Sequence, residues 1–388
     1  MKWLGLVVVL LAAGASPALT RADGCPLPCS GQSASPPDAK LLFVQAEGAG
    51  GPLVAYDTAN GLRRFALPPG RASADGSRYF TAAARHGDTL LSEFSVATGG
   101  SIRGQWVRGR WALAGVSPSG RWLALARRGP SRTRVQIVDA NRGGVAHVLD
   151  LAGDFEVETV SADGKRLFLI EHLAADSAPR YLVRLYDLSR ETLVANPLRA
   201  KGADKVMAGL AWSGIASPDG GWLLTLYLNT SRNQAFVHAL DLRNSRPVCI
   251  DLPSGEGSLA ALKQYALKLS PDGATLYAAN AALGVVAEIE LAQRRVVRSV
   301  HFPRSSWRGA AGPGANATIS RNGRTLYFTG GRDLWAYDAA YGVVRGVYRT
   351  NGAVAGLGFG LGDRRLHVAR ADGRMLTFDA ATGRSMRS

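Results

Sequence analysis

The residues that most often carry chemistry in proteins are few in this chain and widely spaced. No two of its six histidines stand at the spacing of a metal-binding pair; they are His86, His147, His172, His238, His301 and His367. By register most of them fall in or beside predicted strands, and only His172, next to Glu171, lies at a predicted loop. The three cysteines form neither a Cys-x-x-Cys-His haem attachment nor a zinc-type motif. The sequence thus has no catalytic signature, and we expect no cofactor.

Residues 1–22 resemble an export signal. Lys2 supplies a short basic region, residues 4–15 form an apolar stretch, and small residues follow up to Ala22. The apolar stretch is too short to span a bilayer comfortably. We therefore expect an extracytoplasmic protein, secreted or in the cell envelope, with no transmembrane span after cleavage. An uncleaved anchor is the alternative.

Residues 23–37 are rich in Pro, Ser, Gly and Cys, which predicts a linker or a tail rather than a strand. Cys25 and Cys29 flank Pro26-Leu27-Pro28, and Cys249 lies far away in a predicted strand. An oxidising compartment favours one disulfide with one thiol left over. The pairing stays open between Cys25–Cys29 and a bridge from either of these residues to Cys249.

The net charge of +16 comes almost wholly from arginine, since only seven of the 46 basic residues are lysine. A basic protein suggests a nucleic-acid or anionic partner. These arginines are dispersed, however, with no run longer than two and no basic helix. We therefore expect no specific nucleic-acid binding, whereas an acidic or otherwise anionic partner fits the charge.

Two short phrases repeat along the chain and must position any functional side chain. The first is a tight turn of the Ser-Pro-Asp-Gly type, in which Pro presets φ, Asp bonds back to the backbone and Gly accepts a positive φ. Its copies are Ser73-Ala74-Asp75-Gly76, Ser117-Pro118-Ser119-Gly120, Ser161-Ala162-Asp163-Gly164, Ser217-Pro218-Asp219-Gly220, Ser270-Pro271-Asp272-Gly273 and Ser320-Arg321-Asn322-Gly323, with degenerate copies at 37–40 and 361–364. The second is a strand ending in Asp before another turn, as in Val54-Ala55-Tyr56-Asp57 and Trp335-Ala336-Tyr337-Asp338. We expect this Asp to cap the turn, which is a structural role.

Short strands in sets of four, at a period of roughly 40 to 55 residues, predict an all-β chain folded as a single β-propeller. The phrases resemble the repeats of the YVTN-type and WD-repeat-like propeller superfamily, and the copy from Ser270 to Leu291 is the most similar. The resemblance covers residues 38–388 and implies seven or eight four-stranded blades, with eight slightly favoured by the count of phrases. It implies little about function, because that superfamily mixes enzymes, electron-transfer subunits and binding scaffolds.

The predicted topology places the long loops on one face of the ring. If the strands of a blade are lettered A to D from the centre outward, the A–B and C–D turns share one face, and the B–C loops and D–A crossovers share the other. The long segments belong to the second group and are expected at 172–181, 197–211, 229–235, 253–262 and 303–315. Elaborated loops on a rigid scaffold are typical of a binding site. The predicted binding residues on this face form a basic, partly aromatic rim: Arg180, Arg199, Lys201, Lys205, Arg232, Lys263, Arg304, Trp307 and Arg308.

We predict that the protein is an exported, monomeric, non-catalytic binding or scaffold module whose unidentified protein partner or anionic ligand binds on this rim. The alternative comes from the resemblance, because propeller lactonases and related hydrolases hold a divalent metal with Glu, Asp and Asn side chains at the channel mouth. The residues that could do so here are Glu171, Asn229 and Asn280, near the ends of predicted B strands.

Overall fold

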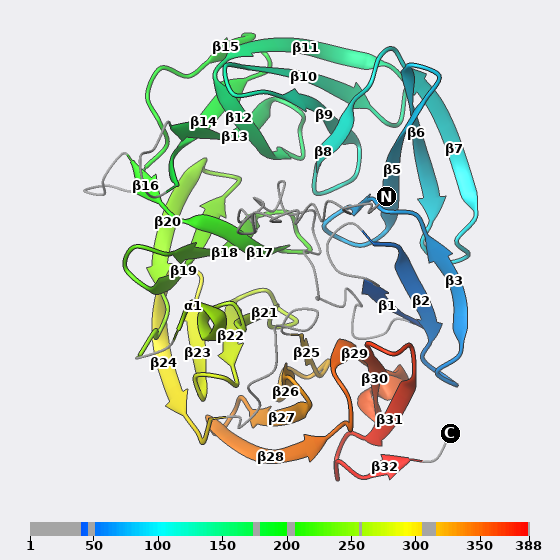
Figure 1. The fold of residues 1–388 in the computed structure, drawn as a ribbon, viewed down its shortest axis with the longest axis vertical. Coiled ribbons are helices and arrows are strands. Elements are labelled where there is room, and N and C mark those ends of the chain that lie inside the picture. The colour runs from blue at the N-terminus through cyan, green and yellow to red at the C-terminus, as the bar shows by residue number, and fades with distance from the viewer. Residues whose placement is uncertain are drawn as a thin grey trace, which may run out of the picture.

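The chain forms a ring of eight antiparallel sheets (Figure 1). The computed structural model describes residues 40–45, 51–173, 179–199, 206–255, 258–304 and 316–386. Within these residues the only helical elements are α1 (Leu259–Leu262) and the short 3₁₀ turn η1 (Leu361–Asp363). The structure is therefore a single eight-bladed β-propeller, which confirms the predicted fold class and the favoured count of eight.

Each blade is one sheet whose strands follow in chain order from the centre of the ring outward (Figure 1). Blade 1 contains β1 (Leu41–Gln45), β2 (Leu53–Asp57) and β3 (Arg63–Leu67), and blade 2 contains β4 (Arg71–Ala72), β5 (Arg78–Arg85), β6 (Asp88–Ser95) and β7 (Ser101–Val107). Blade 3 contains β8 (Ala112–Val116), β9 (Trp122–Arg128), β10 (Arg132–Asp139) and β11 (Val145–Ala152). Blade 4 contains β12 (Asp154–Val160), β13 (Arg166–Leu173), β14 (Arg180–Asp187) and β15 (Thr192–Leu193), and β16 (Met207–Ala208) also pairs with β14. Blade 1 thus has three strands in the described residues.

Blades 5 to 8 each have four strands. Blade 5 contains β17 (Leu210–Ala216), β18 (Trp222–Asn229), β19 (Gln234–Asp241) and β20 (Arg246–Asp251). Blade 6 contains β21 (Ala266–Leu269), β22 (Thr275–Asn280), β23 (Val285–Glu290) and β24 (Arg295–His301). Blade 7 contains β25 (Ala317–Ile319), β26 (Thr325–Gly330), β27 (Asp333–Asp338) and β28 (Val343–Arg349), and blade 8 contains β29 (Val354–Phe359), β30 (Arg365–Arg370), β31 (Met375–Asp379) and β32 (Ser385–Met386).

The turn chemistry predicted from the repeats is confirmed. In blade 6 the Ser270 hydroxyl donates to Asp272 at 2.5 Å, and Asp272 accepts the backbone N–H of Ala274 at 3.0 Å. Gly273 has φ +72°, a value that side chains with a β-branch resist. In the second phrase, Asp338 accepts hydrogen bonds from the backbone N–H groups of Ala340 and Tyr341, each at 3.0 Å. The repeated aspartates therefore cap turns, as expected.

Two of the predicted loops are shorter than expected because strand pairing continues into them. His172 and Tyr181 are paired partners on β13 and β14, so the prediction that His172 lies in a loop is wrong. The predicted crossover 197–211 contains a bridge between Leu198 and Val183, then β16, then the start of β17. In both cases cross-strand hydrogen bonds from a neighbouring strand outweigh the local polarity on which the loop prediction rested.

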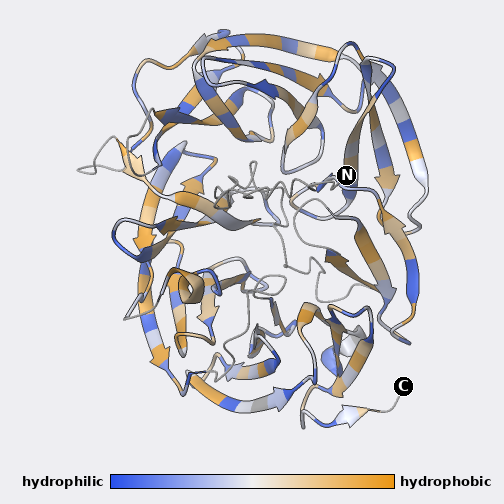
Figure 2. Cartoon of the chain, in the orientation of Figure 1, coloured by the Kyte–Doolittle hydropathy of each residue, from blue (hydrophilic) through white to orange (hydrophobic). Residues whose placement is uncertain are grey.

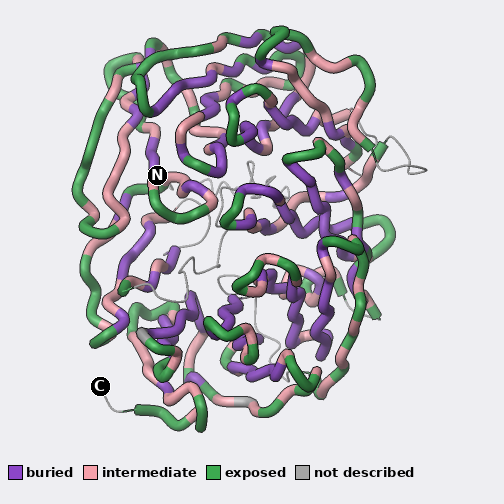
Figure 3. Tube along the Cα trace, turned by 180° about the vertical axis from the view of Figure 1, so that it is seen from behind, coloured by how far each residue is buried: buried purple, intermediate pink, exposed green. Residues whose placement is uncertain are grey.

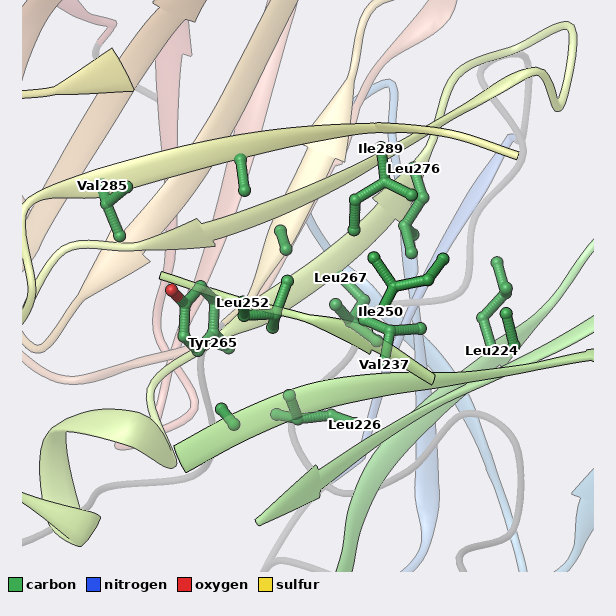
Figure 4. Packing of buried hydrophobic residues seen from close by; sticks show 14 of the residues in the cluster. Leu224, Leu226, Val237, Ile250, Leu252, Tyr265, Leu267, Leu276, Val285 and Ile289 are labelled. Carbon is green, nitrogen blue, oxygen red and sulfur yellow. The ribbon is translucent and has the colours of Figure 1, made fainter. Parts of the chain in front are cut away.

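The core consists of apolar side chains packed between the faces of neighbouring blades. Hydrophobic residues are concentrated in the strands, and exposed residues follow the turns and the outer rim (Figures 2 and 3). Blades 5 and 6 share the largest cluster, in which Leu226, Val237, Tyr265 and Ile289 are all buried (Figure 4). Because each blade buries its face against the next, the ring is held together by these contacts.

The ring closes between blades 8 and 1 through side-chain packing. Leu42 and Val44 of β1 lie against β29, where a Cβ on Gly358 would be 2.6 Å from Leu42 and one on Gly356 2.6 Å from Val44. Arg365 adds a hydrogen bond from Nη1 to the carbonyl of Ala59, at 3.0 Å. In the described residues these two blades are separate sheets, so no strand is shared across the closure.

Several arginines link one blade to the next by donating to backbone carbonyls. Arg78 binds Glu93 in its own blade and reaches the carbonyl of Gly120 in blade 3, at 3.0 Å. Arg166 donates to the carbonyl of Arg243 across blades 4 and 5, at 2.9 Å. Part of the arginine excess is therefore structural, which weakens the inference from net charge to an anionic partner.

Candidate functional site

A hollow lies on the inner wall of the ring, across blades 2 to 5, in the described residues. Its empty volume is about 740 Å³, which includes open solvent at its mouth. Innermost strands and the turns beside them supply most of the lining, which consists of Arg71, Ala72, Ala74, Val116, Pro118, Glu156, Val157, Glu158, Thr159, Ala211, Gly214, Ala216, Leu223, Thr225, Tyr227 and Leu242. We call this the inner cavity. It combines charged and hydroxyl groups with an aliphatic surface, as small-molecule sites do.

A β-bulge in β12 lies beside the inner cavity. The pairing with β13 runs from Val157 opposite Leu169 to Thr159 opposite Phe168, so Glu158 is the extra residue. Bulges occur in the corresponding place in β8, β17 and β29, at Ala114, Trp212 and Ala355. A bulge breaks the alternation of a strand and re-aims its side chains. In blade 4, Glu156 and Glu158 of this one strand both line the same cavity.

Glu156 is held in place by two basic side chains. Its Oε2 accepts a hydrogen bond from Arg128 Nη1 at 3.2 Å and lies 2.9 Å from His172 Nε2. Arg128 also binds Asp154, the first residue of β12. This carboxylate is therefore anchored on one side of the inner cavity and oriented by its partners.

Glu158 is in a different state from Glu156. Its Oε2 is buried and has no hydrogen-bond partner in the part of the chain that the structure describes. Burial and, as the smaller cause, the neighbouring charge of Glu156 together raise the pKa of Glu158 to about 8. Because a buried carboxylate without a partner is costly, Glu158 holds a proton at neutral pH.

Arg71 is the cation of the inner cavity. Its Nε donates to the carbonyl of Leu113 at 2.9 Å, which links β4 to β8. Burial lowers the pKa of Arg71 to about 10, and the charge of Glu156 acts in the opposite direction. Arg71 therefore remains charged at neutral pH and faces the anchored carboxylate rather than a solvent-exposed surface.

Behind the inner cavity lies an aromatic layer between blades 4 and 5. Tyr227, which lines the cavity and is 4% exposed, stacks on Tyr181 with ring centroids 5.0 Å apart. His238 contacts both rings edge-on and is fully buried, and its two nitrogens have no hydrogen-bond partner among the described residues. Burial lowers the pKa of His238 to about 4, so this histidine is neutral at pH 7. The layer gives the cavity a rigid, uncharged back wall.

The predicted rim residues lie elsewhere. None of those that are described lines the inner cavity, and Lys201, Lys205, Trp307 and Arg308 lie outside the described residues. Arg180, Arg199, Arg232 and Arg304 are exposed, and strand direction places them on the predicted loop face. Lys263 has a structural contact: its Nζ lies 4.5 Å from the ring centroid of Trp212, whose Nε1 donates to the Lys263 carbonyl.

The three predicted metal ligands stand on three different blades, and each has a local partner. Glu171 pairs with Arg184. Asn229 accepts from Ser231 at 2.8 Å and so holds the turn between β18 and β19. Asn280 donates to the Ala261 carbonyl at 2.8 Å and accepts the N–H of Leu283 at 3.0 Å. In the described ranges, no group of three His, Cys, Asp or Glu side chains could hold a metal ion.

The predicted signal, the tail and both of its cysteines fall outside the described residues. Cys249 lies on β20, as predicted for a strand residue, and is an exposed free thiol among the residues that the structure describes. None of the helices in that part of the chain is long and apolar enough to cross a membrane.

Sequence reasoning missed the inner cavity, although one signal was present. The stretch Phe155-Glu156-Val157-Glu158-Thr159-Val160 places two acids in a strand that precedes a Ser-Ala-Asp-Gly turn. A strand in that position is innermost in its blade, where a glutamate faces either the inner wall or a neighbouring blade. Two such residues in one innermost strand indicate a polar inner wall.

The fold defines the class of this protein as an eight-bladed β-propeller, and the described residues leave a hollow with a mixed polar and aliphatic lining on its inner wall. No family model matches the chain, and no curated protein does. Solved structures share the fold at low identity. The Dos1 propeller has a TM-score of 0.53 at 12% identity, over 91% of this chain and 92% of that one.

Two further structures are similar at the same level. Dihydro-heme d1 dehydrogenase NirN in complex with DHE has a TM-score of 0.52 at 17% identity, over 91% of this chain and 75% of that one. A eukaryotic initiation factor has a TM-score of 0.51 at 14% identity, over 92% of this chain and 87% of that one. At these identities the likeness establishes the fold alone.

Proposed function

We propose that this protein is an exported binding module that holds a small organic ligand in the inner cavity and performs no chemistry on it. The observation that carries the proposal is the buried Oε2 of Glu158, which has no hydrogen-bond partner among the described residues and belongs to the cavity lining. A buried polar atom without a partner destabilises the fold unless a ligand or water satisfies it. A ligand in the cavity would supply that partner.

The lining supports binding better than catalysis. The residues known to line the cavity include no Ser, Cys or His that could act as a nucleophile or base. The hydroxyl of Thr159 donates to the Val116 carbonyl at 3.2 Å, and Glu156 is fixed by Arg128 and His172. Glu156 and Thr159 are therefore fixed polar groups beside an aliphatic wall, which suits them to orient a ligand.

The exposed arginines of the loop face support a second, separate role as a partner surface. Arg180, Arg199, Arg232 and Arg304 lie on that side, and rim charges chiefly change association rates. A metal-dependent hydrolase is the weaker proposal, because the side chains of Asn229 and Asn280 hold turns and that of Glu171 pairs with Arg184.

Binding in the inner cavity can be tested without knowing the ligand. The purified protein is dialysed to equilibrium against a small-molecule extract, and the compounds enriched on the protein side are identified by mass spectrometry. Ala216→Leu adds bulk to the lining, whereas Ala112→Leu makes the same change at an exposed position of β8 outside it. We expect a compound enriched by the wild type and by Ala112→Leu but not by Ala216→Leu. Equal enrichment by all three would contradict the proposal.

A further inference from the structure

We infer that the ligand carries a primary ammonium group that binds the carboxyl groups of Glu158 and Glu156, with its alkyl body against the aliphatic lining. This inference rests on the proposed function, because it assigns a chemical class to the ligand of the inner cavity. It commits the site to small alkylamines rather than to neutral alcohols, anions or inorganic cations.

The first argument is the sign of the charge near Glu158. The neighbouring charge that most affects Glu158 is that of Glu156, which raises its pKa and therefore makes the surroundings negative. Tyr227 lines the same space, and its pKa is raised by burial first, with the charge of Glu156 among the smaller causes. A negative, poorly solvated site favours a cation.

The second argument concerns the other charged groups that face this space. Arg71 carries the same positive charge as an ammonium group and would repel it, but the carboxylate with which Arg71 interacts is Glu156. Arg128 and His172 are bound to Glu156 as well. The ammonium group is therefore expected nearest to Glu158, the carboxyl group that these basic side chains do not contact in the described interactions.

The third argument is the rest of the lining. Val157, Ala211, Ala216 and Leu223 supply an aliphatic surface, and the ring of Tyr227 adds an aromatic wall of the kind that attracts cations. A hydrated inorganic ion would leave this apolar surface unused, whereas an alkyl chain attached to the ammonium group would cover it.

Binding must exchange one cation for another at Glu158. The free protein holds a proton on this carboxyl group at neutral pH, because its pKa is about 8. When the ammonium group binds, its N–H groups donate to the ionised carboxylate, and the displaced proton passes to the solvent. Below the pKa of Glu158 each bound amine should therefore release about one proton, and affinity should rise with pH by up to about tenfold per pH unit.

The experiment is calorimetric titration with propylamine and, as its neutral isostere, 1-propanol. Proton release is measured at pH 6.5 in buffers of different ionisation enthalpy. Glu158→Gln keeps the shape of the protonated side chain but cannot ionise. Glu191→Gln removes a carboxylate that lies 73% exposed on the same blade and serves as the matched control. Thermal melts establish that both variants are folded.

We expect propylamine to bind the wild type and Glu191→Gln with release of about one proton. Glu158→Gln should bind propylamine at least about tenfold more weakly, without proton release, and propanol within about threefold of the wild type. Propylamine binding that is unchanged in Glu158→Gln would overturn the inference. Proton release by sodium chloride as large as that by propylamine would assign the site to inorganic cations and overturn it too.

One result separates this inference from the proposed function. If propanol binds as tightly as propylamine and Ala216→Leu abolishes both, the inner cavity is a ligand site but does not select amines. If compounds enriched in the dialysis experiment are lost equally from Ala216→Leu and Ala112→Leu, the proposed function itself fails, whatever the amine does.

Discussion

The innermost strands of blades 4 and 5 differ from those of blades 7 and 8, although all four come from the same repeat. In β25 and β29 every residue is buried. Three of the seven residues of β12 and five of the seven of β17 are only half-buried, and these two strands line the inner cavity. We call blades 2 to 5 the hollow sector, and blades 7, 8 and 1 the closed sector.

A few residues account for the difference. In the closed sector Gly356 and Gly358 allow β1 to approach β29 so closely that a side chain at either position would meet Val44 or Leu42. The bulge alone does not open a cavity, because Ala355 at the β29 bulge is 7% exposed. In the hollow sector the bulges of innermost strands fall at Ala114, Glu158 and Trp212, and of these residues only Glu158 carries a carboxyl group. Two glycines thus let β1 pack closely against β29 in the closed sector, whereas a carboxyl side chain occupies one bulge of the hollow sector.

The largest expected effect is the pH dependence that Glu158 gives to the hollow sector. Its folded pKa, about 8, is raised above the unfolded value near 4.5, so the native state retains a proton that the unfolded state has lost. The free energy of unfolding should therefore fall as pH rises from about 5 to 8, by on the order of 3 kcal/mol. Denaturant titrations across this range should show the fall in the wild type and not in Glu158→Gln. Parallel curves would mean that Glu158 is ionised throughout.

Added bulk should distinguish the two sectors. Gly358→Val places atoms against Leu42 where a Cβ already lies 2.6 Å away, so we expect a loss of about 2 kcal/mol in the free energy of unfolding. Ala216→Leu points more volume toward the inner cavity and should cost less than about 1 kcal/mol. Both values are measured by denaturant unfolding. Equal costs would show that the hollow sector is packed as tightly as the closed one.

The links between blades should matter more than exposed ion pairs within one blade. Arg78→Ala removes a half-buried pair with Glu93 and a bond to blade 3, and we expect a loss of about 1–2 kcal/mol. Arg132→Ala removes an exposed pair with Asp150 and should leave the melting temperature nearly unchanged. A melting-temperature comparison checks this order. The reverse order would remove the structural explanation for the arginine excess.

The smallest expected effect comes from the loop face. One variant carries three substitutions of exposed residues outside the inner cavity: Arg180→Glu, Arg232→Glu and Arg304→Glu. Its free energy of unfolding should change by less than about 0.5 kcal/mol, and its affinity for propylamine should change by less than about twofold. Capture of an acidic partner, if this face serves as a partner surface, should be lost in the same variant. Loss of amine binding would show that the two sites are coupled.

The sequence predicted the parts of this structure that depend on neighbouring residues. The turn at Ser270-Pro271-Asp272-Gly273 and the capping role of Asp338 follow from local hydrogen bonds, and the confirmed fold and blade count follow from their repetition. Features that depend on distant residues could not be read in this way. Leu198 appears as a loop residue until its bridge to Val183 is seen.

The inner cavity belongs to the second kind. Glu158 lies at a bulge, where the pairing with β13 skips that residue, and a bulge has no signal in the alternation of a strand. Arg71 and Tyr227 are separated by more than a hundred residues and share the lining only through the closed ring. The exposed arginines were easier to notice in the sequence, but none of those described lies in the cavity.

The most direct test of the account is a crystallographic fragment screen with chemically diverse small molecules soaked into the unliganded protein. We predict that bound fragments will gather in the inner cavity between Glu158 and Leu223, and that amines will be prominent among them. Fragments found on the loop face, with the inner cavity empty at saturating concentrations, would contradict the claim that this propeller binds its ligand on the inner wall of blades 2 to 5.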